Sequence, residues 1–239
     1  MPNQQLVGAL PGEVLGTLAD VILKLKNGGL SHDELKRFAK RENPFAAEAP
    51  CTHPGLIAPD APIDWANFYR EVFGEEHDFY TLKIPVHEGF GRTIIVAKGM
   101  MPERLFLKCL ETFKAWKWTD RSLDDLVISD RTAKDGSYAV CFRNTVEADA
   151  NLKLMSANDL KAANIPGITL EERLLMELKY FKETGKHLDL KNVTLCSGSR
   201  CSVGHVPSVH WRSSSHEMDI SRYDADDRHD SLRAREAVS

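Results

Sequence analysis

The residues with the clearest potential for chemistry lie in one stretch near the end of the printed sequence. Cys196, Cys201, His205 and His210 follow a C-x4-C-x3-H-x4-H spacing, and thiolate and imidazole are the ligands that tetrahedral zinc prefers. Structural zinc sites usually begin with a C-x2-C pair, and here Cys196 and His210 would have to point to the same side of two strands. Zinc is therefore one hypothesis, and the alternative is a buried cysteine, a loop cysteine and surface histidines.

The turn that follows Cys196 could bind an anion. It combines a glycine, two serine hydroxyl groups and a guanidinium group, which together can form a nest for phosphate or carboxylate. It is neither a P-loop nor a dinucleotide-binding loop, because no Gly-Lys-Ser/Thr sequence opens a helix here. The other interpretation is an ordinary polar turn, since Ser-Gly-Ser is common turn chemistry. With two arginines from the following hairpin, the candidate anion-binding residues are Ser197, Gly198, Ser199, Arg200, Arg212 and Arg222.

Nucleophilic catalysis is a third hypothesis for the same stretch. Ser199, Cys196 or Cys201 could act as the nucleophile, with a histidine as the base and an aspartate such as Asp219 behind it. These are common residues, and the sequence has no Gly-x-Ser-x-Gly nucleophile elbow. The histidines that could serve as the base are His205, His210 and His216. Both an enzyme and a binding protein are compatible with these residues.

A helix and a strand must position this stretch. Thr169 and Glu172 fit a capping box, in which each side chain accepts a hydrogen bond from a free amide of the first turn. Gly185 supplies a left-handed stop, and residues 193–196 then alternate as a strand. The expected apolar face holds Leu170, Leu174, Leu178 and Phe181, and the charged residues expected mostly outside it are Glu171, Arg173, Glu177 and Lys182. We therefore expect a helix packed on a sheet, with the serine–arginine turn open to water.

The rest of the domain alternates between helical and strand patterns. Further strands are predicted at residues 92–98, 116–119, 138–142, 206–212 and 217–223, and a helix starts at Pro102. In the last two strands, we expect one face to be buried, with Val209, Trp211, Met218 and Ile220 on it. The other face is expected to be exposed to solvent and to carry His210, Arg212, Asp219 and Ser221. The fold class is α+β, with a mixed or antiparallel sheet of about five to six strands packed by helices.

Composition divides the chain into three regions. Helical periodicity and a second capping box predict an N-terminal helical hairpin at residues 1–43. Closely spaced prolines mark residues 44–62 as a proline-rich linker. The α+β domain is expected at residues 63–239. Its last segment, residues 224–239, is densely charged and is predicted to be a frayed helix or tail.

Length and charge limit the classes of function. The 239 residues carry a net charge of −4 and a sequence pI of about 6.1, which gives no general attraction for nucleic acid or anionic lipid. No run approaches the roughly 20 apolar residues of a membrane span, and residues 1–10 lack the pattern of a secretion signal. The 5 cysteines are odd in number and scattered, unlike a disulfide framework. We therefore expect a soluble, cytoplasmic protein.

Several runs of the sequence are similar to those of a known group of proteins. They are NVTLCSGSR at residues 192–200, GHVPSVHW at 204–211, YDADD at 223–227 and LRAREAVS at 232–239. On these runs the chain, from about Leu30 onward, resembles a family of uncharacterised bacterial proteins. The resemblance implies a bacterial protein and implies no activity, cofactor or partner. In that family the positions of Cys201 and His205 more often hold acidic or small residues, which argues against a metal site.

The leading functional hypothesis is an intracellular binding or scaffold protein whose contact face is the sheet surface around residues 197–212. The alternative is an enzyme or regulator that handles a phosphorylated ligand or nucleic acid through Arg200, Arg212 and Arg222. The expected partner is therefore an unknown protein or a small anionic ligand. A membrane is not expected, nucleic acid is unsupported by the net charge, and no cofactor is expected beyond the zinc hypothesis.

Overall fold

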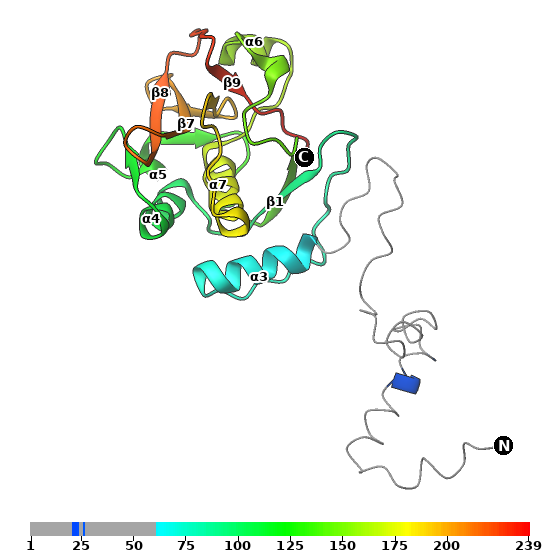
Figure 1. Ribbon diagram of the computed structural model, residues 1–239. Helices are drawn as coiled ribbons and strands as arrows, with labels where there is room; N and C mark the ends of the chain where they lie inside the picture. The colour runs from blue at the N-terminus through cyan, green and yellow to red at the C-terminus, as the bar shows by residue number, and fades with distance from the viewer. Residues whose placement is uncertain (1–20, 24–25, 27–60) are drawn as a thin grey trace, which may run out of the picture. The chain divides into compact units, whose positions relative to one another are not determined.

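The computed structural model describes residues 21–23, 26 and 61–239, and the chain divides into the units Met1–His53 and Pro54–Ser239. Figure 1 shows the elements of the second unit in chain order. Its helices are α3 (Ala61–Phe73), α4 (Pro102–Thr112), α5 (Leu123–Leu126), the 3-10 helix η2 (Ala150–Leu152), α6 (Ala157–Ala162) and α7 (Leu170–Thr184). The predicted N-terminal hairpin and linker lie outside the described residues, apart from positions 21–23, 26, 61 and 62.

A mixed sheet of five strands forms the centre of the fold, as the α+β prediction required. Its strands, in spatial order, are β2 (Ala115–Lys117), β8 (Glu217–Tyr223), β7 (Val206–Arg212), β5 (Val193–Leu195) and β9 (Leu232–Ala234). The outer pairs, β2 with β8 and β5 with β9, are parallel, and the inner pairs are antiparallel. The predicted hairpin of residues 206–223 is confirmed at both strands.

Two smaller antiparallel sheets flank the central one. The first pairs β1 (Arg92–Val96) with β4 (Tyr138–Phe142), and the second pairs β3 (Val127–Ser129) with β6 (Ser199–Cys201). Helix α3 packs its aromatic side chains over the first sheet. The Trp65 indole donates a hydrogen bond to the carbonyl oxygen of Thr93, and the Tyr69 hydroxyl donates to that of Ile95. This stripe therefore belongs to the core, as aromatic residues on one helix face usually do.

Helix α7 runs through the middle of this unit (Figure 1). The capping box of Thr169 and Glu172 is confirmed at its start, and Gly185, at a φ of 68°, ends it. Every residue from Leu170 to Lys179 is buried, so the prediction that Glu171, Arg173 and Glu177 lie mostly outside was wrong. Charged side chains can be buried on all sides of a helix only if polar or oppositely charged groups pair with them. The groups that pair with the α7 side chains are described in the next subsection.

The outer face of the β7–β8 hairpin also differs from expectation at one position. Val209, Met218 and Ile220 are buried against the core, as predicted. Asp219 was expected to be exposed to solvent, yet its side chain is fully buried. Its carboxylate contacts the Arg212 guanidinium, and its strand neighbours in the register are Trp116 of β2 and His210 of β7. The lateral strands and the arginine cover Asp219 and keep it from solvent.

The end of the chain is ordered strand rather than a frayed helix or tail. Strand β9 runs parallel to β5, and beyond it Glu236 forms a bridge with Gly167 and Val238 one with Cys141. Arg143 holds this segment from the side, because its guanidinium donates to both Asp149 and Glu236 at 2.6 Å. Among the charged side chains that suggested a solvated tail, Arg228, Arg235 and Glu236 form ion pairs within the fold.

Candidate functional site

The serine–arginine turn, residues 197–200, is buried, so the expectation that it would be open to water was wrong. Ser199 is 1% exposed, and its hydroxyl oxygen accepts a hydrogen bond of 2.9 Å from the amide of Leu170 at the start of α7. The Arg200 guanidinium donates to the carbonyl oxygens of Ser197 and Ser199, at 2.7 and 2.9 Å. The Ser199 hydroxyl and the Arg200 guanidinium are therefore engaged inside the protein, whereas the buried Ser197 hydroxyl has no hydrogen-bond partner among the described residues.

Glycine serves close packing in this turn. A Cβ atom placed on Gly167 would lie 1.8 Å from the Ser197 hydroxyl oxygen, and one on Gly198 would lie 2.5 Å from the carbonyl oxygen of Gly167. The two backbones approach each other where the amide of Gly198 donates to the carbonyl of Ile168, at 3.0 Å. The glycine that suggested a phosphate nest therefore lets two segments touch.

Two glutamates of α7 have contrasting surroundings beside the turn. Glu172 receives a bidentate ion pair from Arg131 and a hydrogen bond from the Tyr138 hydroxyl. Glu171 has no basic partner among the described residues and accepts a hydrogen bond of 2.7 Å from the Ser129 hydroxyl. Burial raises the pKa of Glu171 to about 7. The buried carboxyl group of Glu171 is therefore partly protonated near neutral pH.

The cysteines and histidines of the zinc hypothesis are dispersed. Cys196 is fully buried, and burial raises the pKa of its thiol, whereas zinc binds the thiolate. His205 pairs with Asp224 at 2.8 Å, and His210 lies on the outer face of the hairpin across from Asp219. Within residues 21–23, 26 and 61–239, no three His, Cys, Asp or Glu side chains are grouped to hold a metal ion. The zinc site remains a prediction.

The described contacts also contain no pair of a nucleophile and a histidine base of the kind that the catalytic hypothesis requires. Ser199 hydrogen-bonds to Ser129 and to the Leu170 amide, and no contact with a histidine is seen for its hydroxyl. Burial raises the pKa of Cys196 and of Cys201, which favours the unreactive thiol over the thiolate. Catalysis at these residues stays a prediction.

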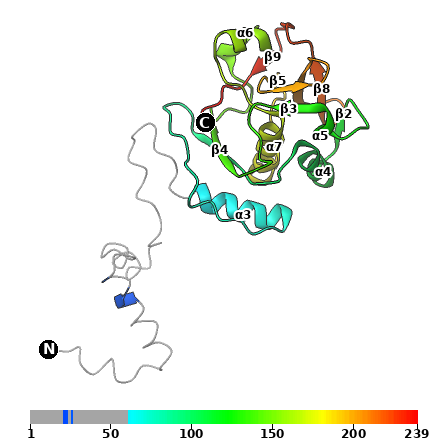
Figure 2. The ribbon, with the colours of Figure 1, turned by 180° about the vertical axis from the view of Figure 1, so that it is seen from behind.

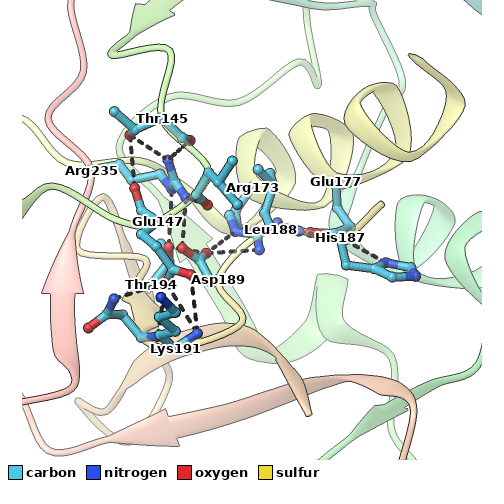
Figure 3. Close-up of polar contacts among 12 residues, drawn as sticks. Thr145, Glu147, Arg173, Glu177, His187, Leu188, Asp189, Lys191, Thr194 and Arg235 are labelled. Carbon is cyan, nitrogen blue, oxygen red and sulfur yellow. Dashed lines mark hydrogen bonds and ion pairs between the residues drawn. The ribbon is translucent and has the colours of Figure 1, made fainter. Parts of the chain in front are cut away.

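A network of buried charges joins α7 to the end of the chain (Figure 3). The Asp189 carboxylate accepts hydrogen bonds from Arg173 at 3.0 Å and from Arg235 at 2.7 Å, and it also binds the Thr194 hydroxyl. Arg173 donates at 2.7 Å to Glu177, so two guanidinium groups face two carboxylates. The signs cancel within the network, so it presents no net charge to a ligand, and removal of any one partner would leave an uncompensated buried charge.

The three arginines of the predicted anion site do not converge. Side chains alternate along a strand, so Arg222 shares a face of β8 with Met218 and Ile220, toward the core. Arg212 lies on the opposite face, where it pairs with Asp219 and Glu217. With Arg200 bound to backbone carbonyl groups, only Arg222 of the three remains without a partner among the described residues.

Arg222 lines a hollow of about 220 Å³. Some of its other lining residues belong to α5 or follow β2, and these two elements lie close together at one edge of the central sheet (Figure 2). The segment between β2 and α5 forms one wall, and the turn after β6 forms another. The lining residues are Trp118, Thr119, Arg121, Leu126, Cys201, Ser202, Val203 and Arg222. We call this feature the arginine hollow.

The walls of the arginine hollow are fixed by neighbouring contacts. Lys117 binds the Glu103 carboxylate and the carbonyl oxygen of Arg121, at 2.7 and 2.8 Å. Glu103 also accepts from the Leu123 amide at 2.7 Å, which ties both ends of this loop to α4. On the other wall, the Ser202 amide donates to the carbonyl oxygen of Leu126 at 2.9 Å. The hollow is thus held in shape before any ligand binds.

The charge of the arginine hollow is unbalanced. Neither Arg121 nor Arg222 forms an ion pair with a carboxylate, or a side-chain hydrogen bond, within the part of the chain that the structure describes. Both side chains are exposed to solvent. Two uncompensated guanidinium groups that line one concave surface attract a negatively charged ligand.

Sequence reasoning named Arg222 as an anion ligand and Cys201 as a zinc ligand or nucleophile, and it missed the other residues of the hollow. Arg121 and Trp118 follow β2, and they reach Arg222 because Lys117 pairs with Ile220 in parallel register. The Trp118 amide continues this pairing with a hydrogen bond of 3.1 Å to the carbonyl oxygen of Ile220. A parallel pairing between segments so far apart leaves no local sequence pattern.

Comparisons with protein-family models, curated proteins and solved structures gave no match to this chain. The resemblance to a bacterial family, drawn from the runs within residues 192–239, therefore stays a prediction.

Proposed function

We propose that this protein binds a small anionic ligand in the arginine hollow. The observation that carries the proposal is the pair of guanidinium groups, Arg121 and Arg222, that line one hollow without acidic partners among the described residues. This retains the binding role expected from the sequence and takes a phosphate or carboxylate ligand from the alternative hypothesis. Arg222 is retained from the predicted site, and Arg121 replaces Arg200 and Arg212.

The chemistry of the hollow favours an oxyanion. Guanidinium groups donate paired hydrogen bonds to the oxygens of phosphate and carboxylate, and such charge-assisted bonds are stronger than neutral ones. The Thr119 hydroxyl accepts a hydrogen bond of 3.1 Å from the Arg121 amide, so its own proton remains to be donated. A dianion would match the two arginines in charge. Because both side chains are exposed, binding should weaken as salt is added.

The proposal includes a location in the cytoplasm. Cys109, Cys141, Cys196 and Cys201 are free thiols, which is typical of a reducing compartment. Among the helices of the described residues, none combines the length and apolar character needed to cross a membrane. Fractionation of the cells that make the protein would test the location.

Calorimetric titration with inorganic phosphate tests the proposed function directly. We expect saturable binding to the wild-type chain and a loss of about tenfold or more in affinity for Arg121→Gln and for Arg222→Gln, the equivalent of one charged contact. Arg70→Gln is the matched control, since Arg70 is exposed and pairs with Glu76 away from the hollow. An equal loss in the Arg70 variant, or no saturable binding to the wild type, would refute the proposal.

A further inference from the structure

The arginine hollow has two chemically different sides. Arg121, Arg222, Thr119 and Ser202 supply charge and hydroxyl groups. The remaining lining residues are the apolar or weakly polar Trp118, Leu126, Val203 and Cys201. An inorganic anion would use only the first group and leave the second in contact with water.

The apolar side is more than the edge of the core. Val203 is 66% exposed at the tip of the turn after β6, so its apolar side chain is accessible to a ligand in the hollow. Trp118 and Leu126 are half-buried and pack against core residues, and their remaining surface is free to touch a ligand. Burial also raises the pKa of the Cys201 thiol, so this residue adds an uncharged surface to the same side.

The volume limits what can fill both sides. Sites for drug-sized ligands usually measure about 300–1,000 Å³, and this hollow measures about 220 Å³. A nucleotide or a polymer segment would project out of it, while a single anionic group with one compact apolar substituent would fit.

We propose that the ligand of the arginine hollow is an amphipathic monoester, a phosphate group that carries one small apolar ring. The phosphate lies between Arg121 and Arg222, and the ring lies against Trp118, Leu126 and Val203. This inference rests on the proposed function and adds the class of ligand to it. The turn that carries Val203 then serves as the apolar lip of the site.

Phenyl phosphate, methyl phosphate and inorganic phosphate are the probes that test this inference on the full chain. We expect phenyl phosphate to bind roughly tenfold tighter than the other two, because only its ring removes apolar surface from water. Val203→Ser should weaken phenyl phosphate severalfold and leave inorganic phosphate unchanged. Val203 is exposed, so this variant should fold like the wild type. Leu126→Ala provides a second variant, in α5, and should show the same selective loss.

The outcomes separate this inference from the proposed function. Equal affinities for the three probes, with saturable binding of each, would overturn the amphipathic ligand and leave anion binding intact. Tighter binding of phenyl phosphate that neither Val203→Ser nor Leu126→Ala weakens would also overturn it, because the ring would then lie elsewhere. Absence of binding for all three probes would overturn both proposals.

Discussion

Two pairs of arginines show how differently the same side chain is used in this molecule. Arg173 and Arg235 are buried, and each one donates to the Asp189 carboxylate and to at least one other acceptor. Arg121 and Arg222 are exposed and line a hollow without a carboxylate partner in the described part of the chain. The buried pair is matched in charge by carboxylates, and the exposed pair has no carboxylate partner among the described residues.

The difference follows from solvation. A buried guanidinium loses its water and must recover the lost interactions from the protein, so its removal or exposure disturbs the fold. An exposed guanidinium keeps its water and needs no protein partner, so nothing in the fold requires two of them to share one hollow. Matched charges therefore mark structural positions here, and unmatched ones mark the candidate site.

Asp189→Asn should have the largest effect and tests the matched pair. Asparagine keeps the shape of the side chain but leaves Arg173 and Arg235 short of one negative charge in the interior. We expect a loss of about 3–5 kcal/mol in the free energy of unfolding, measured by urea denaturation. Asp230→Asn is the control, because Asp230 is 84% exposed in its pair with Lys153 and should change stability by less than about 0.5 kcal/mol.

Glu171 tests what happens when a buried charged group has no partner of opposite charge, because its carboxyl group has no basic partner among the described residues. Its pKa is about 7 in the fold and 4.5 without the fold's influence, so the folded state binds more protons between these values. The contribution of the protonated Glu171 carboxyl group to the stability of the folded state is complete below pH 4.5 and is lost as the pH rises to about 7. We expect the wild type to lose about 3 kcal/mol of unfolding free energy relative to Glu171→Gln over this range.

Denaturation curves of both proteins at several pH values provide the measurement. Glu88→Gln, an exposed glutamate between β1 and α3, should follow the wild-type profile. Parallel profiles for the wild type and Glu171→Gln would show that Glu171 is not the group that titrates.

Gly167→Ala tests whether the serine–arginine turn belongs to the fold or to a ligand site. The added methyl group would meet the Ser197 hydroxyl oxygen at 1.8 Å, so the two backbones must separate. We expect a loss of about 1–3 kcal/mol in unfolding free energy, as for other overpacked positions. Gly136→Ala is the control, because no atom lies within 4 Å of the added carbon. If Gly167→Ala does not reduce stability, the close packing of the two backbones is not needed for folding, and the turn could serve as a ligand site.

Arg222→Gln should have the smallest effect on stability and completes the comparison. Removal of an exposed side chain without an ion-pair partner in the described residues should change the free energy of unfolding by less than about 0.5 kcal/mol. The same substitution is expected to weaken phosphate binding, so stability and affinity respond independently. A loss of several kcal/mol by thermal or urea denaturation would place Arg222 in the structural group.

Much of this fold could be predicted because its signals are local. The capping box of Thr169, the left-handed Gly185 and the alternation of residues 206–212 and 217–223 each involve neighbours in sequence, and each was confirmed. Strands β1 and β4 were likewise evident from short apolar or alternating runs. Local pattern is sufficient wherever hydrogen bonds or side-chain periodicity connect residues a few positions apart.

The failures have one physical cause, which is that distant partners change the environment of a polar residue. Arg173 looked like a surface residue because nothing nearby in sequence indicates that Asp189 will reach it inside the fold. Ser199 looked accessible because its hydrogen-bond partner, the amide of Leu170, is distant from it in the sequence. The arginine hollow was missed for the same reason, since Arg121 and Arg222 meet only through the pairing of β2 with β8.

The pairing of the chain's final residues has a consequence for synthesis. Val238 completes a bridge to Cys141, Glu236 one to Gly167, and Leu232–Ala234 complete the edge of the central sheet beside β5. A nascent polypeptide emerging from the ribosome would lack these contacts until residue 238 had left the exit tunnel. The domain should therefore complete its folding only after β9 and the residues that follow it have been synthesised.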